Sequence, residues 1–543
     1  MKKQGFWCRI GLLFLAISLV SSSTGVLLNE NSTTSASLDD YAPGEIINVT
    51  VSPPYPHLGT PIDLTITLKG NPGESRFNET ITVTDTYEGI IAVPGGITWM
   101  KGESLVTHLS VTIGRASTYT KKVRWDPCFV GNHSLSFETG IFPARRKNIS
   151  VHYETPTIIY PSLGCPAILR KNTSEQLIIG IAEDRAAQQH PLLIKEINVE
   201  RVNGVDTYSI DQQNSCRVHW IAASETSVQD ELVACYSINT IPVGFYNVSI
   251  TTNATTYRWP HAVQIIDDDP SEFTFVQLTD PHIGKSYVPG NEKKELLKKI
   301  RVITEDLQPD FIVISGDLVD WYNSRFHAAT YPDFVDVLVT CTVPVYTLPG
   351  NHDRYEHGLK LFYAPYMDLS SYHRYLNPLS DYVFDYGSVN FIMLNSGYDY
   401  SRWENCPESS GLTDLQMDLL EHQWGNTTLN HIIIMHHPAV NEINDKGLGK
   451  VPNSLPSGND ECIAFHRAEF ISYCQENNVS LVLCGHTHEN HVYTSEGTVP
   501  DDPFAWPLFV QTDTATLKKE RSGGRVIVIH QGIVESYEYQ SFS

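Results

Sequence analysis

The chain has 543 residues, more than one hydrophobic core can serve, so we expect roughly two to four domains. Hydrophobic residues make up 41% of it and charged residues 18%, which is ordinary for a globular protein. The formal net charge of −24 argues against a protein that binds nucleic acid or an anionic membrane, because both need a basic surface.

Residues 1–25 are typical of a signal peptide. Lys2 and Lys3 precede the apolar run Ile10–Val20, and small residues suited to cleavage follow this run. The run is too short to cross a bilayer comfortably. We therefore expect cleavage, secretion to the extracellular space or cell surface, and no transmembrane segment in the mature chain. An uncleaved anchor is the alternative.

Sequons and cysteines also suit an exported chain. Ten Asn-X-Ser/Thr sequons are present, eight of them before residue 270, and N-glycans are expected if the source is eukaryotic or archaeal. Of ten cysteines, Cys8 leaves with the signal peptide, so an odd number remains and at least one thiol is free in a monomer. We predict disulfides between Cys216 and Cys235 and between Cys406 and Cys462.

Two all-β domains are predicted after a Ser- and Thr-rich leader at 26–40. Residues 41–154 show short alternating strands separated by Gly, Pro and Asn turns, and residues 155–268 repeat the pattern, which predicts two immunoglobulin-like or fibronectin-like sandwiches. Neither contains a His, Asp or Cys cluster with ligand spacing, so a structural or spacer role is favoured over a binding role. The clearest predicted strands are Ile62–Leu68, Thr80–Thr84, Leu105–Ile113, Leu177–Ile181, Tyr246–Ile250 and Ala262–Ile266.

From residue 269 onward apolar strands alternate with helical stretches, which indicates an α/β domain over 269–543. Ligands in such folds gather at the carboxyl ends of the strands. One helix is expected to begin at a capping box of Thr413 and Gln416 and to stop at Gly425. The predicted strands are Phe273–Leu278, Phe311–Ser315, Pro344–Leu348, Phe391–Leu394, Ile432–Met435 and Leu481–Cys484, and the predicted helices are Glu292–Thr304, His327–Leu338, Asp414–Trp424 and Ile463–Asn477.

Five short motifs begin close to the ends of these predicted strands. The ligand candidates among their side chains are three carboxylate or amide oxygen donors and four imidazoles, with no cysteine, and this mixture suits a pair of divalent or trivalent metal ions. Each motif is weak alone, because a single buried His is more often a core residue than a ligand. In chain order they are Asp280-Pro281-His282, Gly316-Asp317, Gly350-Asn351-His352-Asp353, His436-His437 and Gly485-His486-Thr487-His488.

The order of these motifs resembles that of the calcineurin-like metallophosphoesterase superfamily, over about residues 272–535. The resemblance implies a four-layer β-sandwich flanked by helices as the catalytic fold, and a dinuclear centre of Mn, Fe, Zn or Co ions. It assigns Asp280, His282 and His488 to a first metal, Asn351, His436 and His486 to a second metal, and Asp317 to a bridge between them.

A shared carboxylate can hold two cations about 3.5–4 Å apart, and their charge turns a bound water into hydroxide near neutral pH. That metal-bridging hydroxide would attack phosphorus in line with the leaving oxygen. The chain is therefore predicted to be a secreted, metal-dependent phosphoric ester hydrolase, acting on a small-molecule, lipid or nucleotide phosphomonoester or phosphodiester. The alternative is a surface adhesion or scaffold protein with a weakly active or inactive phosphoesterase domain, against which the intact set of ligands argues.

His352 and Asp320 are predicted to be catalytic rather than ligands. By resemblance, His352 stabilises the transferring phosphoryl group or protonates the leaving alkoxide, while Asp320 hydrogen-bonds His352 and raises its pKa. The alternative for Asp320 is to cap a following turn. Purple acid phosphatases carry an iron-binding tyrosine where Asp320 stands, so no tyrosinate-bound iron is expected. His437 is predicted to pack behind the site, because it faces the other side of an extended segment from His436.

Overall fold

The computed structural model divides the chain into two units, residues 1–42 and the compact unit 43–543. In the first unit the description covers residues 37–42, with a short 3-10 helix, Leu38–Asp40, and the predicted signal peptide lies outside the described residues. The described residues are 37–54, 56–59, 62–73, 75–125, 127, 129–140, 142–153, 157–171, 173, 175–184, 192–210, 216–221, 229–285, 291–320, 327–357, 366–397, 411–441, 462–517 and 522–542.

Residues 46–151 form two antiparallel sheets that share a hydrophobic core. On β2, buried and half-buried side chains alternate, as expected for a strand with one face toward the core. The first sheet has the order β1-β2-β5 and consists of β1 (Ile46–Ser52), β2 (Ile62–Lys69) and β5 (Thr118–Trp125). The second has the order β4-β3-β6-β7 and consists of β3 (Phe77–Val93), β4 (Gly96–Ile113), β6 (Gly131–Thr139) and β7 (Arg145–Val151).

The prediction of short strands in this region is wrong for β3 and β4, which form one long hairpin of 17 and 18 residues. Glycines inside these strands are sites of close approach rather than turns. A Cβ on Gly89 would lie 2.2 Å from the carbonyl oxygen of Val130, and one on Gly102 would lie 2.4 Å from the hydroxyl of Tyr87. Gly89 and Gly102 are therefore positions at which a neighbouring group packs closely against the strand backbone.

Residues 157–266 form a second pair of sheets, in the orders β13-β14-β10-β8 and β12-β11-β15-β16-β9. Cys216 and Cys235 lie opposite each other in the β13–β14 register, while Cys406 lies outside the described residues, so both disulfides stay predictions, as do the domain boundaries. The strands are β8 (Thr157–Tyr160), β9 (Ala167–Arg170), β10 (Gln176–Asp184), β11 (Ile194–Arg201), β12 (Thr207–Ser209), β13 (Cys216–Ile221), β14 (Gln229–Ser237), β15 (Gly244–Thr252) and β16 (Thr256–Ile266).

The rest of the chain contains two larger mixed sheets whose faces pack on each other. Phe275 from one sheet meets Phe391 from the other edge-to-face, with ring centroids 5.3 Å apart, and Phe311 contacts Phe391 at the same distance. The first sheet, β19-β18-β17-β28-β29, consists of β17 (Glu272–Leu278), β18 (Phe311–Ser315), β19 (Val345–Leu348), β28 (Gly524–His530) and β29 (Ile533–Gln540). The second, β22-β23-β24-β25-β27-β26, consists of β22 (Tyr382–Tyr386), β23 (Val389–Leu394), β24 (Asn430–Met435), β25 (Val479–Cys484), β26 (His491–Tyr493) and β27 (Leu508–Gln511).

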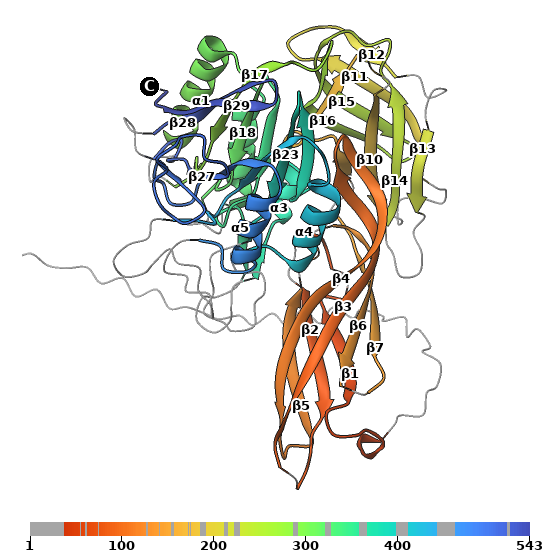
Figure 1. Ribbon diagram of the computed structural model, residues 1–543. Coiled ribbons are helices and arrows are strands. Elements are labelled where there is room, and N and C mark those ends of the chain that lie inside the picture. The colour runs from red at the N-terminus through yellow and green to blue at the C-terminus, as the bar shows by residue number, and fades with distance from the viewer. Residues whose placement is uncertain are drawn as a thin grey trace, which may run out of the picture. The chain divides into compact units, whose positions relative to one another are not determined.

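Helices flank these sheets, which confirms the predicted α/β fold (Figure 1). Thr413 and Gln416 form the predicted capping box, and Gly425 is the C-cap of a π-helical turn, Leu420–Trp424, that ends the helix. The prediction of a helix from Ile463 is wrong at its start, because α5 begins at Arg467. The helices are α1 (Asn291–Val302), which continues as a π turn (Ile303–Leu307), α2 (His327–Leu338), α3 (Ser370–Tyr375), α4 (Asp414–Leu419) and α5 (Arg467–Glu476); a small hairpin pairs β20 (Tyr355–His357) with β21 (Tyr366–Asp368).

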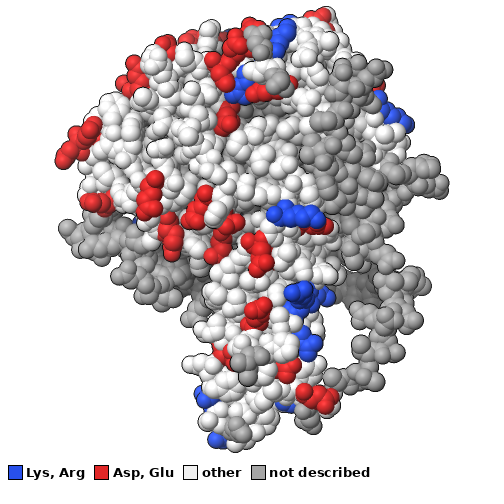
Figure 2. Space-filling model, turned by 45° about the vertical axis from the view of Figure 1, so that its right-hand side comes forward, with Lys and Arg blue, Asp and Glu red and all other residues white. Residues whose placement is uncertain are grey.

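On the face shown in Figure 2, acidic side chains are more widespread than basic ones, and in several places an acidic and a basic side chain lie next to each other. No helix in the described parts of the chain is long and apolar enough to span a bilayer.

Candidate metal centre

Parallel strands bring the five motifs to one edge of the paired sheets. β17, β18 and β19 run parallel, as do β23, β24 and β25, so their carboxyl ends lie together. Each motif begins directly after β17, β18, β19, β24 or β25, or within two residues of it. The two sheets contribute to the same site, because the amide of His486, after β25, donates to Asp280 Oδ2, after β17, at 3.0 Å.

Three glycines let these loops approach closely enough for their ligand atoms to meet. A Cβ on Gly316 would lie 2.4 Å from His436 Nδ1, and one on Gly350 would lie 2.3 Å from Asp317 Oδ1. A Cβ on Gly485 would lie 1.9 Å from the hydroxyl of Thr279. These distances are shorter than any real contact, so side chains here would push the motifs apart.

Substitution of Gly485 tests this requirement. We expect Gly485→Ala to reduce metal affinity at least about tenfold, because the new methyl group would also lie 2.4 Å from Asp280 Oδ2 and displace that carboxylate. Competition with a fluorescent chelator would measure the affinity. Gly204→Ala is the control, since its methyl group would meet only the flexible side chain of Arg201 at 3.2 Å. Unchanged metal affinity in the Gly485 variant would contradict the prediction.

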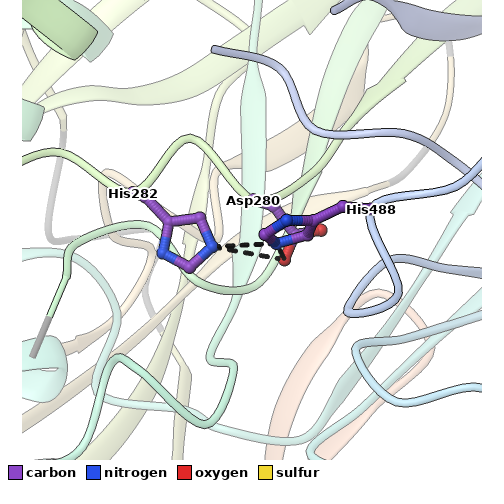
Figure 3. Close-up of side chains that lie close together, drawn as sticks. All are labelled: Asp280, His282 and His488. Carbon is purple, nitrogen blue, oxygen red and sulfur yellow. Dashed lines mark hydrogen bonds and ion pairs between the residues drawn. The ribbon is translucent and has the colours of Figure 1, made fainter. Parts of the chain in front are cut away.

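The first predicted ligand cluster consists of Asp280, His282 and His488 (Figure 3). His282 Nε2 lies 3.0 Å from His488 Nε2 and 3.7 Å from Asp280 Oδ1, and His488 Nε2 lies 3.2 Å from the same oxygen. Asp280 and His282 are buried. Three donor atoms converge from loops that are about two hundred residues apart in sequence, a geometry that suits a cation.

The second cluster is built around His436 and Asp317. The Nδ1–H of His436 donates to the carbonyl of Ser315 at 2.9 Å, which leaves Nε2 as the donor atom toward the site. Nε2 lies 2.9 Å from Asn351 Oδ1 and 3.3 Å from Asp317 Oδ1. When His436 is neutral, all three atoms present electron pairs, and a cation among them would relieve their repulsion.

Asp317 is the carboxylate that faces both clusters. Its Oδ1 lies next to His436, and its Oδ2 lies 3.5 Å from His282 Nε2 in the first cluster. Oδ1 also accepts the backbone amide of His352 at 2.8 Å. Asp317 is thus placed where the predicted bridging ligand would have to be.

His486 and His437 complete the edge of the second cluster. The ring of His486 lies 5.3 Å from that of His436 and 4.4 Å from that of His437. His437 is buried, and its Nδ1 lies 2.9 Å from the hydroxyl oxygen of Ser396. The same oxygen accepts a hydrogen bond from the backbone amide of His437. The expectation that His437 faces away from His436 is wrong, because the two rings lie 5.1 Å apart and both lie beside His486.

The loops hold several of these residues in strained backbone conformations. Asp280, His282, Asp317, His486 and His488 all have positive φ, between 44° and 68°. Residues other than glycine rarely adopt this region, and such strain persists at functional sites where the surrounding structure compensates it. The strain is therefore concentrated at the predicted ligands.

Electrostatics couple the acids and imidazoles. Burial alone would raise the pKa of Asp280, but the hydrogen bond to His488 and the charge of His436 hold this pKa below its usual range. Burial would likewise raise the pKa of Asp317, yet neighbouring imidazoles lower it well below its usual range. Burial disfavours the charged form of His436, but Asp317 and Asp280 raise its pKa to about 10. Without metal, the raised pKa values of His436 and His352 favour protons that balance the buried carboxylates, whereas burial lowers the pKa of His282.

Asp320 lies between two imidazoles. Its Oδ2 is 3.2 Å from His282 Nδ1 and 3.8 Å from His352 Nδ1, and the ammonium of Lys285 lies 3.7 Å from the same oxygen. Burial opposes the charged form of His352, but Asp317 and Asp320 give it a net raised pKa. The sequence paired Asp320 with His352 alone, whereas the structure places it closer to His282, where it can also orient a predicted metal ligand.

Asp353 has a role that sequence reasoning missed. Its buried carboxylate accepts the backbone amides of Gly350 at 2.8 Å, Leu318 at 3.0 Å and Val319 at 3.2 Å, so it ties the loop after β19 to the loop after β18. Burial and the charge of Asp317 raise its pKa to about 7. In the sequence, only the position of Asp353 in the Gly350-Asn351-His352-Asp353 motif indicated a role. Spacing alone cannot distinguish a metal ligand from a residue that holds two loops together by hydrogen bonds.

The next residue, Arg354, extends this support. Its guanidinium is buried and donates to Asn395 Oδ1 at 2.8 Å. The Asn395 amide donates to Asp381 Oδ1 at 2.8 Å, and the side chain of Gln416, from the capping box of α4, donates to the same oxygen at 2.6 Å. A chain of polar contacts thus joins the loop after β19 to the start of α4.

The part of the chain that contains the five motifs matches a known protein family. Residues 273–490 match the family model of the calcineurin-like phosphoesterases. This part of the chain is a calcineurin-like phosphoesterase domain. Domains of this family hold divalent metal ions, and the clusters around Asp280 and Asp317 offer side chains of the required kind.

Two curated relatives of the phosphoesterase domain are both named probable cyclic nucleotide phosphodiesterases. The protein of Colwellia psychrerythraea is 36% identical over 90 residues, which are 15% of this chain and 31% of the relative. The protein of Coxiella burnetii is 24% identical over 198 residues, which are 35% of this chain and 65% of the relative. The chain thus spans under a third of one relative and just under two thirds of the other.

Among solved structures, the purple acid phosphatase from yellow lupin (Lupinus luteus) seeds is similar at a TM-score of 0.42 and 13% identity, with 91% of this chain and 93% of that chain covered. A likeness of this degree bears on neither substrate nor metal.

Proposed function

We propose that the chain is a dinuclear-metal phosphoesterase that hydrolyses small phosphodiesters or phosphomonoesters. The observation that carries the proposal is the convergence of Asp280, His282 and His488 on one side of Asp317, and of His436 and Asn351 on the other. The names of the two relatives favour a diester, and cyclic nucleotides are the first substrates to test.

The proposed ligand roles are those that the resemblance implied. Asp280, His282 and His488 would hold one ion, Asn351, His436 and His486 the other, and Asp317 both. Bound ions would supply positive charge at the reacting phosphorus and an activated water. Neutral imidazoles and carboxylates are the donors that Mn, Fe, Zn and Co accept, so the donor set leaves the metal open among these.

Asp320, His352 and Asp353 would have different roles in this reaction. Asp320 would hold His282 and His352 in their working orientations through their Nδ1 atoms. His352, whose side chain is 21% exposed, reaches solvent and hence a substrate, and it would donate a proton to the departing oxygen or stabilise the phosphoryl oxygens. The hydrogen bonds that the backbone amides of Gly350 and Leu318 donate to Asp353 would keep His352 and Asp317 at their mutual distance.

Metal analysis and two chromogenic substrates test the function. The purified full chain should hold about two metal ions and lose its activity on chelation. Faster hydrolysis of bis-p-nitrophenyl phosphate than of p-nitrophenyl phosphate would identify a diesterase, and the reverse a monoesterase. No hydrolysis of either substrate, or of 3′,5′-cyclic AMP, by the fully loaded protein would overturn the proposal in favour of a scaffold.

Metal binding should depend on pH in a defined direction. His436 must lose its proton to bind a metal, and its pKa is raised to about 10, so metal and proton compete over the whole neutral range. We expect apparent metal affinity to fall about tenfold for each pH unit between pH 8 and 6, for each proton displaced. Chelator competition at several pH values would measure the slope. An affinity independent of pH would contradict the ligand role of His436.

We also propose that the enzyme is secreted and glycosylated. Support comes from the apolar run Ile10–Val20 and from sequons whose asparagines are exposed, such as Asn48, Asn78 and Asn148. Expression in a eukaryotic secretory host, followed by glycosidase treatment and N-terminal sequencing of the medium fraction, tests both parts. Retention of an unprocessed chain inside the cells would contradict them.

A further inference from the structure

The segment 512–516, which we call the threonine loop, follows β27 and lies beyond residues 273–490, the part of the chain that matches the family model. β27 runs parallel to β25, so their carboxyl ends lie at the same edge of the sheet. The threonine loop therefore begins beside the loop that carries His486 and His488. Three of its five residues are threonines, and all five are buried. None of the predicted site residues belongs to it.

Two hydroxyl groups of the threonine loop hydrogen-bond the backbone of the first ligand loop, which follows β17. The hydroxyl of Thr514 donates to the carbonyl of Asp280 at 2.7 Å. The hydroxyl of Thr516 donates to the carbonyl of Pro281, also at 2.7 Å. Asp280 and Pro281 are buried, so a carbonyl that lost its donor here would find no water in its place.

The backbone that these hydroxyl groups hold is strained. Its φ is 52° at Asp280 and 44° at His282. The amides of these two residues donate to the carbonyls of Gly316 and Asp317, after β18, at 3.1 and 2.9 Å. The loop after β18 thus holds the amides while the threonine loop holds the carbonyls, and bonds on both sides compensate for the unfavourable φ. A change of φ at either residue would turn its side chain relative to His488.

The same part of the chain also holds the loop that carries His488. The amide of Thr512 donates to the carbonyl of Cys484 at 3.0 Å, directly before the Gly485-His486-Thr487-His488 motif. One residue before the threonine loop, the side-chain carbonyl of Gln511 accepts the hydroxyl of Thr487 at 2.8 Å. Residues 511–516 are therefore bonded to both of the loops whose side chains form the first ligand cluster (Figure 3).

We propose that Thr514 and Thr516 are positioning residues for one ion of the dinuclear centre. Their hydroxyl groups hold the backbone that carries Asp280 and His282, so that these two side chains meet at His488. The inference rests on the proposed function, because it requires a metal ion at the first ligand cluster. Removal of a hydrogen-bonding group behind a metal ligand typically lowers metal affinity about 10- to 100-fold.

The second ligand cluster is supported by other groups. His436 donates through Nδ1 to the carbonyl of Ser315 at 2.9 Å, and Asp317 Oδ1 accepts the amide of His352 at 2.8 Å. Neither contact involves the threonine loop. Loss of a threonine hydroxyl should therefore weaken the ion at the first cluster more than the ion at the second.

Titration of the chelator-stripped full chain with Zn2+ tests the proposal, with Thr514→Val and Thr516→Val compared with the unmodified protein. Valine resembles threonine in size but has no hydroxyl group. We expect each variant to bind one ion with nearly the unmodified affinity and the other at least about tenfold more weakly, as competition with a fluorescent chelator would measure. Thr514→Ser keeps the hydroxyl and should restore the affinity for both ions.

Thr498→Val is the control, because Thr498 is exposed and its hydroxyl lies 2.9 Å from that of Thr494, in the turn after β26. If Thr514→Val fails to fold, Thr516→Val decides, since Thr514 Oγ1 also accepts the amides of Thr516 and Leu517 and its loss is the larger change. Unmodified affinity for both ions in the valine variants, or an equal loss in Thr514→Ser, would overturn the positioning role and leave the proposed function intact. An unmodified chain that bound no metal would overturn the proposed function, and this inference with it.

Discussion

Asp317→Asn is expected to abolish stable metal binding at both ligand clusters and to lower turnover at least about a thousandfold. The carboxylate lies 3.3 Å from His436 Nε2 through one oxygen and 3.5 Å from His282 Nε2 through the other. An amide has one oxygen and one NH2 group, so it offers a ligand to one side only and turns a positively polarised donor toward the other. The substitution also removes the negative charge that two cations share.

Metal analysis by mass spectrometry and initial rates on bis-p-nitrophenyl phosphate would measure this effect. Asp310→Asn is a matched control, because Asp310 directly precedes β18 and Asp317 follows the same strand at its other end. We expect the control to keep its metal content and most of its activity. If Asp317→Asn kept close to full metal content and activity, Asp317 would not be a bridging ligand.

His352→Ala should keep both metal ions yet lower turnover at least about a hundredfold for substrates with poor leaving groups. His352 Nε2 lies 3.8 Å from Asp317 Oδ2, and its Nδ1 lies 3.8 Å from Asp320 Oδ2, so it is beside the predicted ligands. An alkoxide must receive a proton as it departs, whereas p-nitrophenolate is stable without one. A residue that donates this proton therefore matters more for an alkyl ester than for a nitrophenyl ester.

The measurement compares an alkyl phosphodiester with bis-p-nitrophenyl phosphate, together with metal content. His491→Ala is the control, since His491 begins β26 beyond the Gly485-His486-Thr487-His488 motif, has a side chain that is 43% exposed, and contacts Glu489 at 3.0 Å. We expect this control to hydrolyse both substrates at nearly the unmodified rate. Loss of metal in His352→Ala, or an equal decrease for both leaving groups, would contradict the proton-donor assignment.

Much of the phosphoesterase fold could be predicted because its strands are short, apolar and buried on both faces. Phe311–Ser315 and Val479–Cys484 are buried at every residue, so hydrophobic runs marked them clearly. The capping box at Thr413 was equally visible, because the chemistry that caps a helix is local in sequence. In contrast, the length of the β3–β4 hairpin was not predicted, because Gly89 and Gly102 lie inside the strands against close neighbours rather than in turns, and no local pattern shows those neighbours.

By itself the sequence determined the inventory of the site: which carboxylates, amides and imidazoles follow which strands, and that this donor set suits metal ions rather than a thiol or a serine nucleophile. Only the tertiary structure decided how these groups are used. It separated Asp353, which binds backbone amides, from Asp317, which faces both clusters, and it placed Asp320 nearer His282 than His352. Ligation and orientation depend on distances between atoms that are hundreds of residues apart in the chain, and these distances are set by how the two sheets pack.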